Sequence, residues 1–418
     1  MDRTFTPELA PDVLDRLADY AASFRDDFNR GRQAAWCGVY LHGLLQDGDR
    51  KSVEPMAARV PRPEGLADPD QVLQQFLGQS PWDERTVLER YRATMAAKLA
   101  DPDAIFVIDD TTFPKQGTHS VGVQRQYCGA LGKTANCQCA VSVHYVAPRG
   151  HYPLDMRLYL PDSWLDDEPR LDKAGVPEEE RRRLSKGRIA LELLDRVRAE
   201  GLPGRVVVAD AGYGVSGPFR DGLAERGLHY IVGVTDDMLV FAEEPQWIDP
   251  ASQTETGGRP RTRPRLTEDS PRPVSLKDLA ARTPRRKVTW REGTKGPMWG
   301  RFAWLRVWPA GGWATGECAF VEPIRLLIEE QVDGKLKYAF SNLPEETSQL
   351  QAVRLWRSRW PVELGYQQMK EELGLDHHEG RSWRGFHHHA CLVMLASGFL
   401  TLERLRARRG RPRPGKKG

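Results

Sequence analysis

Apolar side chains in the first hundred residues recur at helical spacing. One stripe within residues 12–28 consists of Val13, Leu17, Tyr20, Phe24 and Phe28. A second stripe between residues 83 and 99 consists of Leu88, Tyr91, Met95 and Leu99. Because a period near 3.6 residues is that of an amphipathic helix, we predict a helical N-terminal domain over residues 1–100.

From residue 101 the pattern changes to short apolar runs rich in β-branched residues, which are typical of buried strands. Such strands are predicted at 104–108, 138–146, 151–160, 205–209 and 229–234. A charged helix is predicted at 176–200 and a short one at 216–226. This order favours a layered α/β domain with a mixed sheet, and its first part covers residues 101–235.

Residues 236–335 lack that order. Pro, Gly and Arg dominate 257–273, and strand-like pieces follow at 287–291, 302–308 and 324–330. We interpret this region as a β-rich insertion that carries a flexible basic loop. Helical periodicity returns at 346–375 and 386–403, so further helices of the core are predicted within residues 336–403.

Charge changes this picture at two places. The chain of 418 residues has a formal net charge of +3, yet residues 404–418 hold eight Lys or Arg and no acid. Residues 259–301 hold thirteen Lys or Arg against four acids. The low-complexity tail at 404–418 is predicted to be disordered. Two basic zones in an otherwise acidic chain favour a polyanionic partner, although a solvated loop and tail would give the same pattern.

Several classes of protein are excluded. No apolar run approaches the roughly 18 residues of a membrane span. Acidic residues occupy the start of the chain, where a secretory signal is basic and apolar. Six cysteines without a CxxC pair argue against a disulfide scaffold or a zinc ribbon. We therefore expect a cytoplasmic protein with reduced thiols and no membrane contact.

Two of the predicted strands each lead into an aspartate. Asp109 and Asp110 follow the strand at 104–108, and Asp210 follows the strand at 205–209. Acids at the carboxyl ends of strands lie where α/β proteins bind ligands, and carboxylates suit Mg²⁺. Such aspartates also cap helices and turns, so these acids alone do not establish a metal site.

A third acid stands in a regular pattern further along the chain. Trp356, Arg359, Glu363 and Lys370 have offsets of 0, 3, 7 and 14, which places them on one stripe of a helix. A carboxylate between two cations suits a metal next to phosphates. Pro361 permits another interpretation, in which the helix begins near Glu363 and the two earlier residues precede it. An ordinary surface ion pair between Arg359 and Glu363 is a further alternative.

These positions belong to three blocks that resemble the DDE transposases of bacterial insertion sequences, in the four-like superfamily and its seven-oh-one branch. The first block is IDDTTFPKQ at 108–116 with GVQRQYCGALGK at 122–133, and the second is VVADAGYG at 207–214. The third matches the signature Tyr-x2-Arg-x3-Glu-x6-Lys, with Trp356 in place of the tyrosine. Tryptophan keeps an aromatic face but lacks the phenolic hydroxyl.

The resemblance implies an α/β fold, namely an RNase H-like mixed-sheet core with a helical N-terminal domain and a β-rich insertion before the last catalytic helix. It implies that Asp110, Asp210 and Glu363 bind two Mg²⁺ or Mn²⁺ ions, cut insertion-sequence ends and join the 3′-OH to target DNA. Asp110 is preferred to Asp109 because the family's acid directly precedes a Thr-Thr-like pair. Neighbouring strand residues also face opposite sides, so only one of the two acids can be a direct ligand.

The same resemblance implies that Arg359 and Lys370 grip phosphates and that Trp356 offers a stacking face. Lys115 and Arg125 lie in a Gly-rich segment after the first acid, where they could line a DNA channel or belong to a solvated loop. 

Lys295 has glycines nearby on both sides, which suits close approach to a phosphate. Trp299 is a candidate for stacking on a splayed base, although tryptophan is more often a core residue. Arg50, Lys51 and Ser52 form a weak candidate for phosphate contact.

The remaining candidates are histidines and cysteines. His387, His388 and His389 cannot all ligate one metal, since consecutive helical residues point about 100° apart, and we expect them at a helix end or on the surface. His377, His378 and Glu379 could touch DNA or a metal, but their spacing matches no zinc pattern. Two further side chains are expected to be buried as small hydrophobic groups, namely Cys137 and Cys139.

The implied partner is double-stranded DNA, both the terminal inverted repeats and the target. By resemblance the N-terminal helices would bind the repeats, and the chain would act as a homodimer in the DNA complex, associated with the nucleoid. Two other functions stay open. One is a domesticated, catalytically idle DNA-binding protein, against which the intact acids argue. The other is a stand-alone RNase H-like nuclease, which would use the same acids to cut without joining.

Overall fold

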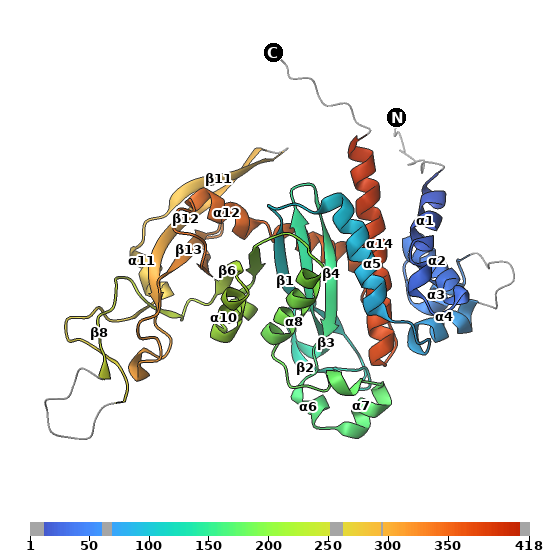
Figure 1. Ribbon diagram of the computed structural model, residues 1–418, viewed down its shortest axis with the longest axis horizontal. Coiled ribbons are helices and arrows are strands. Elements are labelled where there is room, and N and C mark those ends of the chain that lie inside the picture. Colours follow the sequence, from blue (N-terminus) through green and yellow to red (C-terminus); the bar gives the residue numbers. More distant parts are fainter. Residues whose placement is uncertain (1–11, 61–68, 251–261, 294–295, 410–418) are drawn as a thin grey trace, which may run out of the picture. The chain divides into compact units, whose positions relative to one another are not determined.

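The computed structural model describes residues 12–60, 69–250, 262–293 and 296–409 (Figure 1). The chain forms two compact units, which alternate along the sequence. Unit 1 consists of residues 1–104, 109–204 and 361–418, and unit 2 consists of residues 105–108 and 205–360. Strand β1 (Ile105–Pro114) therefore begins in unit 2 and ends in unit 1.

Helices make up the first part of unit 1. They are α1 (Val13–Ala22), α2 (Gly31–Leu45), α3 (Val53–Ala57), α4 (Pro69–Gly78) and α5 (Glu84–Leu99). The two predicted helices are confirmed, although α1 ends at Ala22 and a short 3-10 turn follows. Asp83 caps α5 by accepting the backbone N–H of Arg85 at 3.0 Å, which is a typical helix start.

The long helix α14 (Trp383–Arg409) is the element against which much of unit 1 packs. It contacts α2, α4, α5 and strand β4, and it runs beside α5 in Figure 1. Its middle segment, from Ala390 to Ala396, is buried at every position. A helix that is apolar on all sides belongs in a core, and α14 brings together the N-terminal helices and the strands of unit 1.

Three antiparallel strands of unit 1 follow β1. They are β2 (Gln124–Cys128), β3 (Lys133–Ala147) and β4 (Gly150–Leu158). Strand β3 pairs with β2 through its first residues and with β4 through its later ones, and it is also the neighbour of β1. Most of β3 and β4 is buried, since α8 (Lys186–Ala199) packs on both strands and α5 and α14 pack on β4. Both strands confirm the sequence prediction. Between β4 and α8 lie α6 (Asp162–Leu165), α7 (Glu168–Ala174) and a 3-10 turn (Glu178–Glu180).

The charged helix predicted at 176–200 is wrong in its first ten residues. Helix α8 begins only at Lys186, where the Ser185 hydroxyl accepts the backbone N–H of Arg188 at 3.2 Å. The residues before it bind acids outside their own segment: Arg181 pairs with Asp172, and Arg183 pairs with Asp162 and Asp166. These pairs hold the charged segment in a non-helical form that sequence periodicity does not reveal.

Unit 2 contains a mixed sheet. Strands β1, β5 (Val206–Ala209) and β6 (His229–Val234) run parallel, and β14 (Leu336–Ser341), β13 (Ile324–Glu330) and β12 (Gly296–Pro309) continue the sheet antiparallel. The sheet is completed by β11 (Arg286–Gly293), which pairs with β12, and by β7 (Leu239–Phe241) and β10 (Val274–Ser275). A mixed α/β architecture was predicted, and the structure has it.

The helices of unit 2 are short, and they are α9 (Ala211–Gly214), α10 (Gly217–Glu225), α11 (Leu276–Arg282) and α12 (Gln349–Arg357). The three strand-like pieces of the predicted insertion appear as β11, β12 and β13. Residues 257–261 of its basic loop lie outside the described residues. The described remainder includes β9 (Arg265–Leu266), which pairs with β8 (Trp247–Ile248).

The predicted disorder of the basic tail is wrong for its first residues. Arg404–Arg409 continue α14, and residues 410–418 lie outside the described part of the chain. Just before them, Glu403 pairs with Arg16 at 2.6 Å and with Arg406 at 3.7 Å, which anchors this end of the helix. Within the ranges that the structure describes, no helix combines the length and apolar character needed to cross a bilayer.

Candidate catalytic site

The first two acids lie side by side in β1. The Asp109 carboxylate accepts the backbone N–H of Asp110 at 2.9 Å, so it is occupied within its own strand. The Asp110 carboxylate instead accepts a hydrogen bond from the ammonium of Lys186, with Nζ and Oδ2 2.6 Å apart. Both side chains of this pair are partly exposed, with Asp110 at 29% and Lys186 at 35%. Nothing in the sequence analysis singled out Lys186.

The acid of the second block ends β5 and caps α9. Asp210 accepts the backbone N–H of Gly212 through Oδ1 at 2.9 Å, so the capping role that the sequence left open is present. Close packing explains the glycine at position 214 of this block. A Cβ on Gly214 would lie 1.9 Å from the carbonyl oxygen of Gly233 in β6, so only glycine permits this approach. The block therefore fixes the backbone just after Asp210.

The pairing of β1 with β5 gives the first two blocks a common register. The strands are parallel, and Ile108 is the register partner of Ala209. Asp109 and Asp210 are the next residues in the chain after these partners. Both blocks thus continue from matched positions of neighbouring strands in unit 2.

The third acid stands on the first turn of α13 (Trp360–Glu371), with its side chain exposed. One turn further, the buried Tyr366 hydroxyl is hydrogen-bonded to Ser142 of β3. The Ser142 hydroxyl also lies 2.9 Å from Nε2 of His144, so a buried polar cluster ties α13 to β3. Since buried polar groups are costly unless they are paired, this cluster fixes how α13 presents Glu363.

The single helical stripe predicted for the third block is wrong, and the alternative based on Pro361 is the correct one. Helix α12 ends at Arg357, two turn residues follow, and α13 starts at Trp360 with Pro361 in its first turn. Trp356 lies on α12, Arg359 lies in the turn, and Glu363 and Lys370 share α13. Proline at the start of a helix is favourable because its missing N–H would have no partner there.

The two earlier residues of this block are engaged within unit 2. The Trp356 indole is buried and donates its Nε1–H to Glu329 at 2.7 Å. The Arg359 guanidinium lies 5.7 Å from the centre of the Trp356 ring. The stacking role predicted for Trp356 remains a prediction, and it would require this buried indole to become accessible.

The part of the chain that carries the first two blocks matches a known protein family. Residues 23–297, well over half of the chain, match the family of DDE superfamily endonucleases. The chain belongs to the DDE superfamily of endonucleases. The matched residues include Asp110 and Asp210, and Glu363 lies beyond them.

A curated relative is more specific. This DDE endonuclease is 34% identical over 203 residues to a Microchaete diplosiphon protein described as the probable transposase for insertion sequence element IS701. The alignment covers 48% of this chain and 49% of the relative, so the chain spans about half the length of the curated protein that it matches.

Membership implies dependence on a divalent metal ion, and the acids of the DDE endonuclease have suitable chemistry. Carboxylate oxygens are the ligands that Mg²⁺ and Mn²⁺ take in proteins. Among the residues that the structure describes, no group of three or more His, Cys, Asp or Glu side chains is placed to hold a metal ion. One carboxylate oxygen of Asp110 accepts a hydrogen bond from the ammonium of Lys186, so this acid already binds a positively charged group.

The three basic candidates of unit 1 differ in their hydrogen bonds and in their exposure. Lys115 donates to the carbonyl of His378 at 2.6 Å, and Lys370 donates to the carbonyl of Thr112 at 3.1 Å. Burial lowers the pKa of both ammonium groups. Arg125, on β2, is exposed. Of these three cations, Arg125 is the one whose side chain is open to a ligand.

The candidates of the insertion lie on the β11–β12 hairpin. Trp299 is 46% exposed, and the Lys287 ammonium lies 4.5 Å from the centre of its ring. A second aromatic–cation pair stands near it: Arg357 lies 4.6 Å from the ring of Trp290, and all three of Trp290, Trp299 and Arg357 line one surface depression. Lys295 lies outside the described residues. The hairpin thus presents exposed aromatic and basic groups together.

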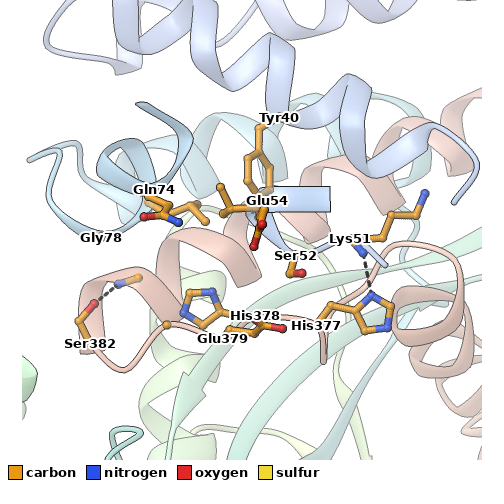
Figure 2. A pocket seen from close by; sticks show the side chains of 14 residues that line it. Tyr40, Lys51, Ser52, Glu54, Gln74, Gly78, His377, His378, Glu379 and Ser382 are labelled. Carbon is orange, nitrogen blue, oxygen red and sulfur yellow. Dashed lines mark hydrogen bonds between the residues drawn. The ribbon is translucent and has the colours of Figure 1, made fainter. Parts of the chain in front are cut away.

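Two segments that the sequence analysis treated separately line one pocket of unit 1 (Figure 2). The backbone N–H of Lys51 donates to Nδ1 of His377 at 3.0 Å, and Arg50 pairs with Glu379 at 2.6 Å. The pocket has a volume of about 300 Å³ and is also lined by Tyr40. The segments are more than 300 residues apart in sequence, so no local pattern could link them.

The expected surface position of the histidine run is wrong, because all three rings are buried. His387 lies 2.9 Å from the carbonyl of Trp383, His388 lies 2.8 Å from that of Leu77, and His389 lies 3.0 Å from that of Gly374. The rings satisfy three different parts of unit 1 as α14 passes through it. The expected burial of Cys137 and Cys139 is confirmed, and all six cysteines are free and buried.

Proposed function

We propose that this DDE endonuclease is a transposase that cuts the ends of an insertion sequence and joins the freed 3′-OH to target DNA. The observation that carries the proposal is the matched register of β1 and β5, from which the first two family blocks continue into Asp109–Asp110 and Asp210. Family membership and the description of the curated relative support the same reaction. The fold that the proposal requires is the RNase H-like core.

In this proposal Asp110, Asp210 and Glu363 hold two divalent ions, Mg²⁺ or Mn²⁺. Such ions would activate the attacking oxygen and stabilise the leaving oxygen in phosphoryl transfer. The chain's own contribution is to position the acids. The α9 cap orients the Asp210 carboxylate, and the Tyr366–Ser142 hydrogen bond holds the helix that carries Glu363.

The proposed partner is double-stranded DNA. The exposed Trp299 with its neighbouring Lys287 would stack on a base and contact phosphate, as aromatic and basic side chains do on splayed strands. Arg125 and Arg359 would contact phosphates, and Lys115 and Lys370 would do so after releasing the carbonyls that they bind. 

The N-terminal helices are proposed to bind the terminal repeats. The chain is proposed to act as a homodimer in the DNA complex, associated with the nucleoid. Both statements rest on the resemblance to transposases rather than on a contact within the chain.

The triad is tested by Glu363→Gln, which removes a carboxylate with little change in shape. Cleavage of a plasmid carrying the flanks of the protein's own gene should fall by about 100-fold or more, since loss of even an outer partner of a metal site costs up to that much. DNA affinity, measured in the same preparation, should change little. Glu371→Gln is the matched control, because it alters another exposed glutamate of α13.

Near wild-type cleavage by Glu363→Gln would remove Glu363 from the site. The joining step needs its own assay, in which pre-cut ends with a free 3′-OH are offered together with target plasmid. Joined products would establish the transposase. Cleavage without joining would indicate the stand-alone nuclease, and DNA binding without either reaction would indicate the idle DNA-binding protein.

A further inference from the structure

The ion pair between Asp110 and Lys186 links two elements that are 76 residues apart in sequence. The ammonium of Lys186 lies 2.6 Å from Oδ2 of Asp110. About a third of each side chain is exposed, so the pair is neither sealed in the core nor fully solvated. Such a pair is held by short-range attraction but remains open to competing ions.

Lys186 occupies a position that its own helix disfavours. It is the first residue of α8, and the first turn of α8 contains no acid. The N-terminus of a helix carries a partial positive charge, which repels a cation and attracts an anion. The position of the ammonium is therefore explained by the carboxylate of Asp110 rather than by the helix.

The other groups near the ammonium do not replace Asp110 as its partner. Burial raises the pKa of the Cys139 thiol to about 12, so this neighbour is uncharged at neutral pH. The next cation of α8, Arg188, pairs with Glu192 at 3.7 Å. Asp110 is the charged group to which Lys186 is bonded.

We infer that Lys186 is a displaceable counter-ion of Asp110, which holds the carboxylate until a divalent cation binds and then turns to a phosphate of the DNA. This inference rests on the proposed function, in which Asp110 is a metal ligand. An ammonium and a divalent ion at one carboxylate repel each other, so they compete for it. The flexible four-carbon stem of lysine permits the movement, and its ammonium suits a phosphate.

Competition of this kind makes the affinity for metal depend on Lys186. In the full chain without DNA, Lys186→Met should bind Mn²⁺ about tenfold more tightly than the wild type, within the range of ordinary coupling between sites. Mn²⁺ binding is measured by the electron paramagnetic resonance signal of the free ion. Arg188→Met is the matched control, since it removes one positive charge from the same turn of α8 and should leave the affinity unchanged.

Unchanged or weaker Mn²⁺ binding by Lys186→Met, with Arg188→Met as the reference, would overturn the inference and make the pair a permanent support of Asp110. Lys186→Gln, which keeps a hydrogen-bond donor without the charge, is a second variant in which Mn²⁺ affinity should also rise. Asp110→Asn tests the metal site independently of Lys186. If Asp110→Asn leaves Mn²⁺ binding intact, the proposed metal site is wrong. If it weakens binding while both Lys186 variants do not alter it, only the inference fails.

The wild-type protein supplies a readout that needs no substitution. Amine-reactive labelling followed by mass spectrometry should show Lys186 becoming more reactive as Mn²⁺ is added, because the ammonium loses its partner. Lys173, an exposed lysine on α7, is the internal reference and should not change. Constant reactivity of Lys186 at saturating Mn²⁺ would contradict displacement.

Discussion

Glu329 in unit 2 and Asp110 in unit 1 both bind a cation, but their surroundings differ. Glu329 is 1% exposed, and it accepts hydrogen bonds from the Trp356 indole and from Arg357. Asp110 is 29% exposed, and it is bonded to the single ammonium of Lys186. Breaking a buried pair leaves an uncompensated charge, whereas a partly exposed pair can exchange partners with solvent ions. Burial therefore distinguishes an acid that holds the fold from an acid that is available for chemistry.

The buried acid should contribute more to stability than the partly exposed one. Glu329→Ala should lower the free energy of unfolding by about 2–3 kcal/mol, because it leaves the buried Trp356 N–H without an acceptor and Arg357, whose side chain is 32% exposed, without its carboxylate. Urea unfolding followed by tryptophan fluorescence measures the loss. Asp110→Asn, measured without divalent ions, should cost about 1 kcal/mol or less. Equal losses in the two variants would abolish the distinction.

The buried, uncharged ring of His387 should make stability depend on pH. His387 places Nδ1 2.9 Å from the Trp383 carbonyl, and its Nε2 accepts the backbone N–H of Leu158 at 3.3 Å, so the neutral ring is satisfied on both sides. Burial lowers its pKa from the usual value to about 3. A lowered pKa means that the folded state resists protonation, so its stabilising contribution is present above pH 6.5 and is lost as the pH falls toward 3.

The free energy of unfolding should therefore fall by about 2 kcal/mol between pH 6.5 and pH 5 through His387 alone. Urea titrations at several pH values measure this slope. In His387→Gln, whose side chain does not titrate, this part of the slope should disappear. A slope that is identical in the wild type and the variant would show that the ring contributes nothing to the pH dependence.

Two tryptophans of unit 2 differ in burial in a similar way, since Trp299 is exposed and Trp356 is buried. Trp299→Ala should weaken binding to DNA by about 1 kcal/mol under the proposal that its exposed ring stacks on a base, and it should leave stability nearly unchanged. Trp356→Phe should instead lower stability by about 1–3 kcal/mol, because it removes the donor to the buried Glu329. Fluorescence anisotropy with labelled DNA and urea unfolding test both variants. The reverse pattern would place the DNA surface at Trp356.

Sequence alone predicted the helices and strands that are marked by a local pattern of apolar residues. The apolar runs that became β1 and β5, and the stripe that became α5, are visible without knowledge of their partners. The break after Arg357 was recognised only as an alternative, because proline at 361 permits either interpretation. Hydrophobic spacing does not distinguish one helix from two when the break falls between residues of the same stripe.

What could not be predicted depends on long-range packing. The burial of His388 depends on a carbonyl group that is distant in sequence, that of Leu77 at the end of α4. The partner of Asp110 is a lysine 76 residues away, and the start of α8 at Lys186 follows a segment whose arginines, Arg181 and Arg183, pair with acids further back in the chain. The acids were recognised from their positions at strand ends and on a helical stripe, and the resemblance grouped three of them as a triad, whereas the residues that position them came from the structure.

The passage of β1 through both units has a consequence for synthesis on the ribosome. The parallel partner of Ile105 is Val206, so roughly 100 residues separate the two strands, and at 5–20 residues per second β1 waits about 5–20 s for it. Unit 1 waits longer, because α14, on which α5 and β4 pack, is made after nearly everything else. During this delay the edge of β1 that later pairs with β5 is open, and other nascent chains can contact it. We therefore expect the yield of native protein to depend on chaperones that cover this strand, more than on the stability of the finished fold.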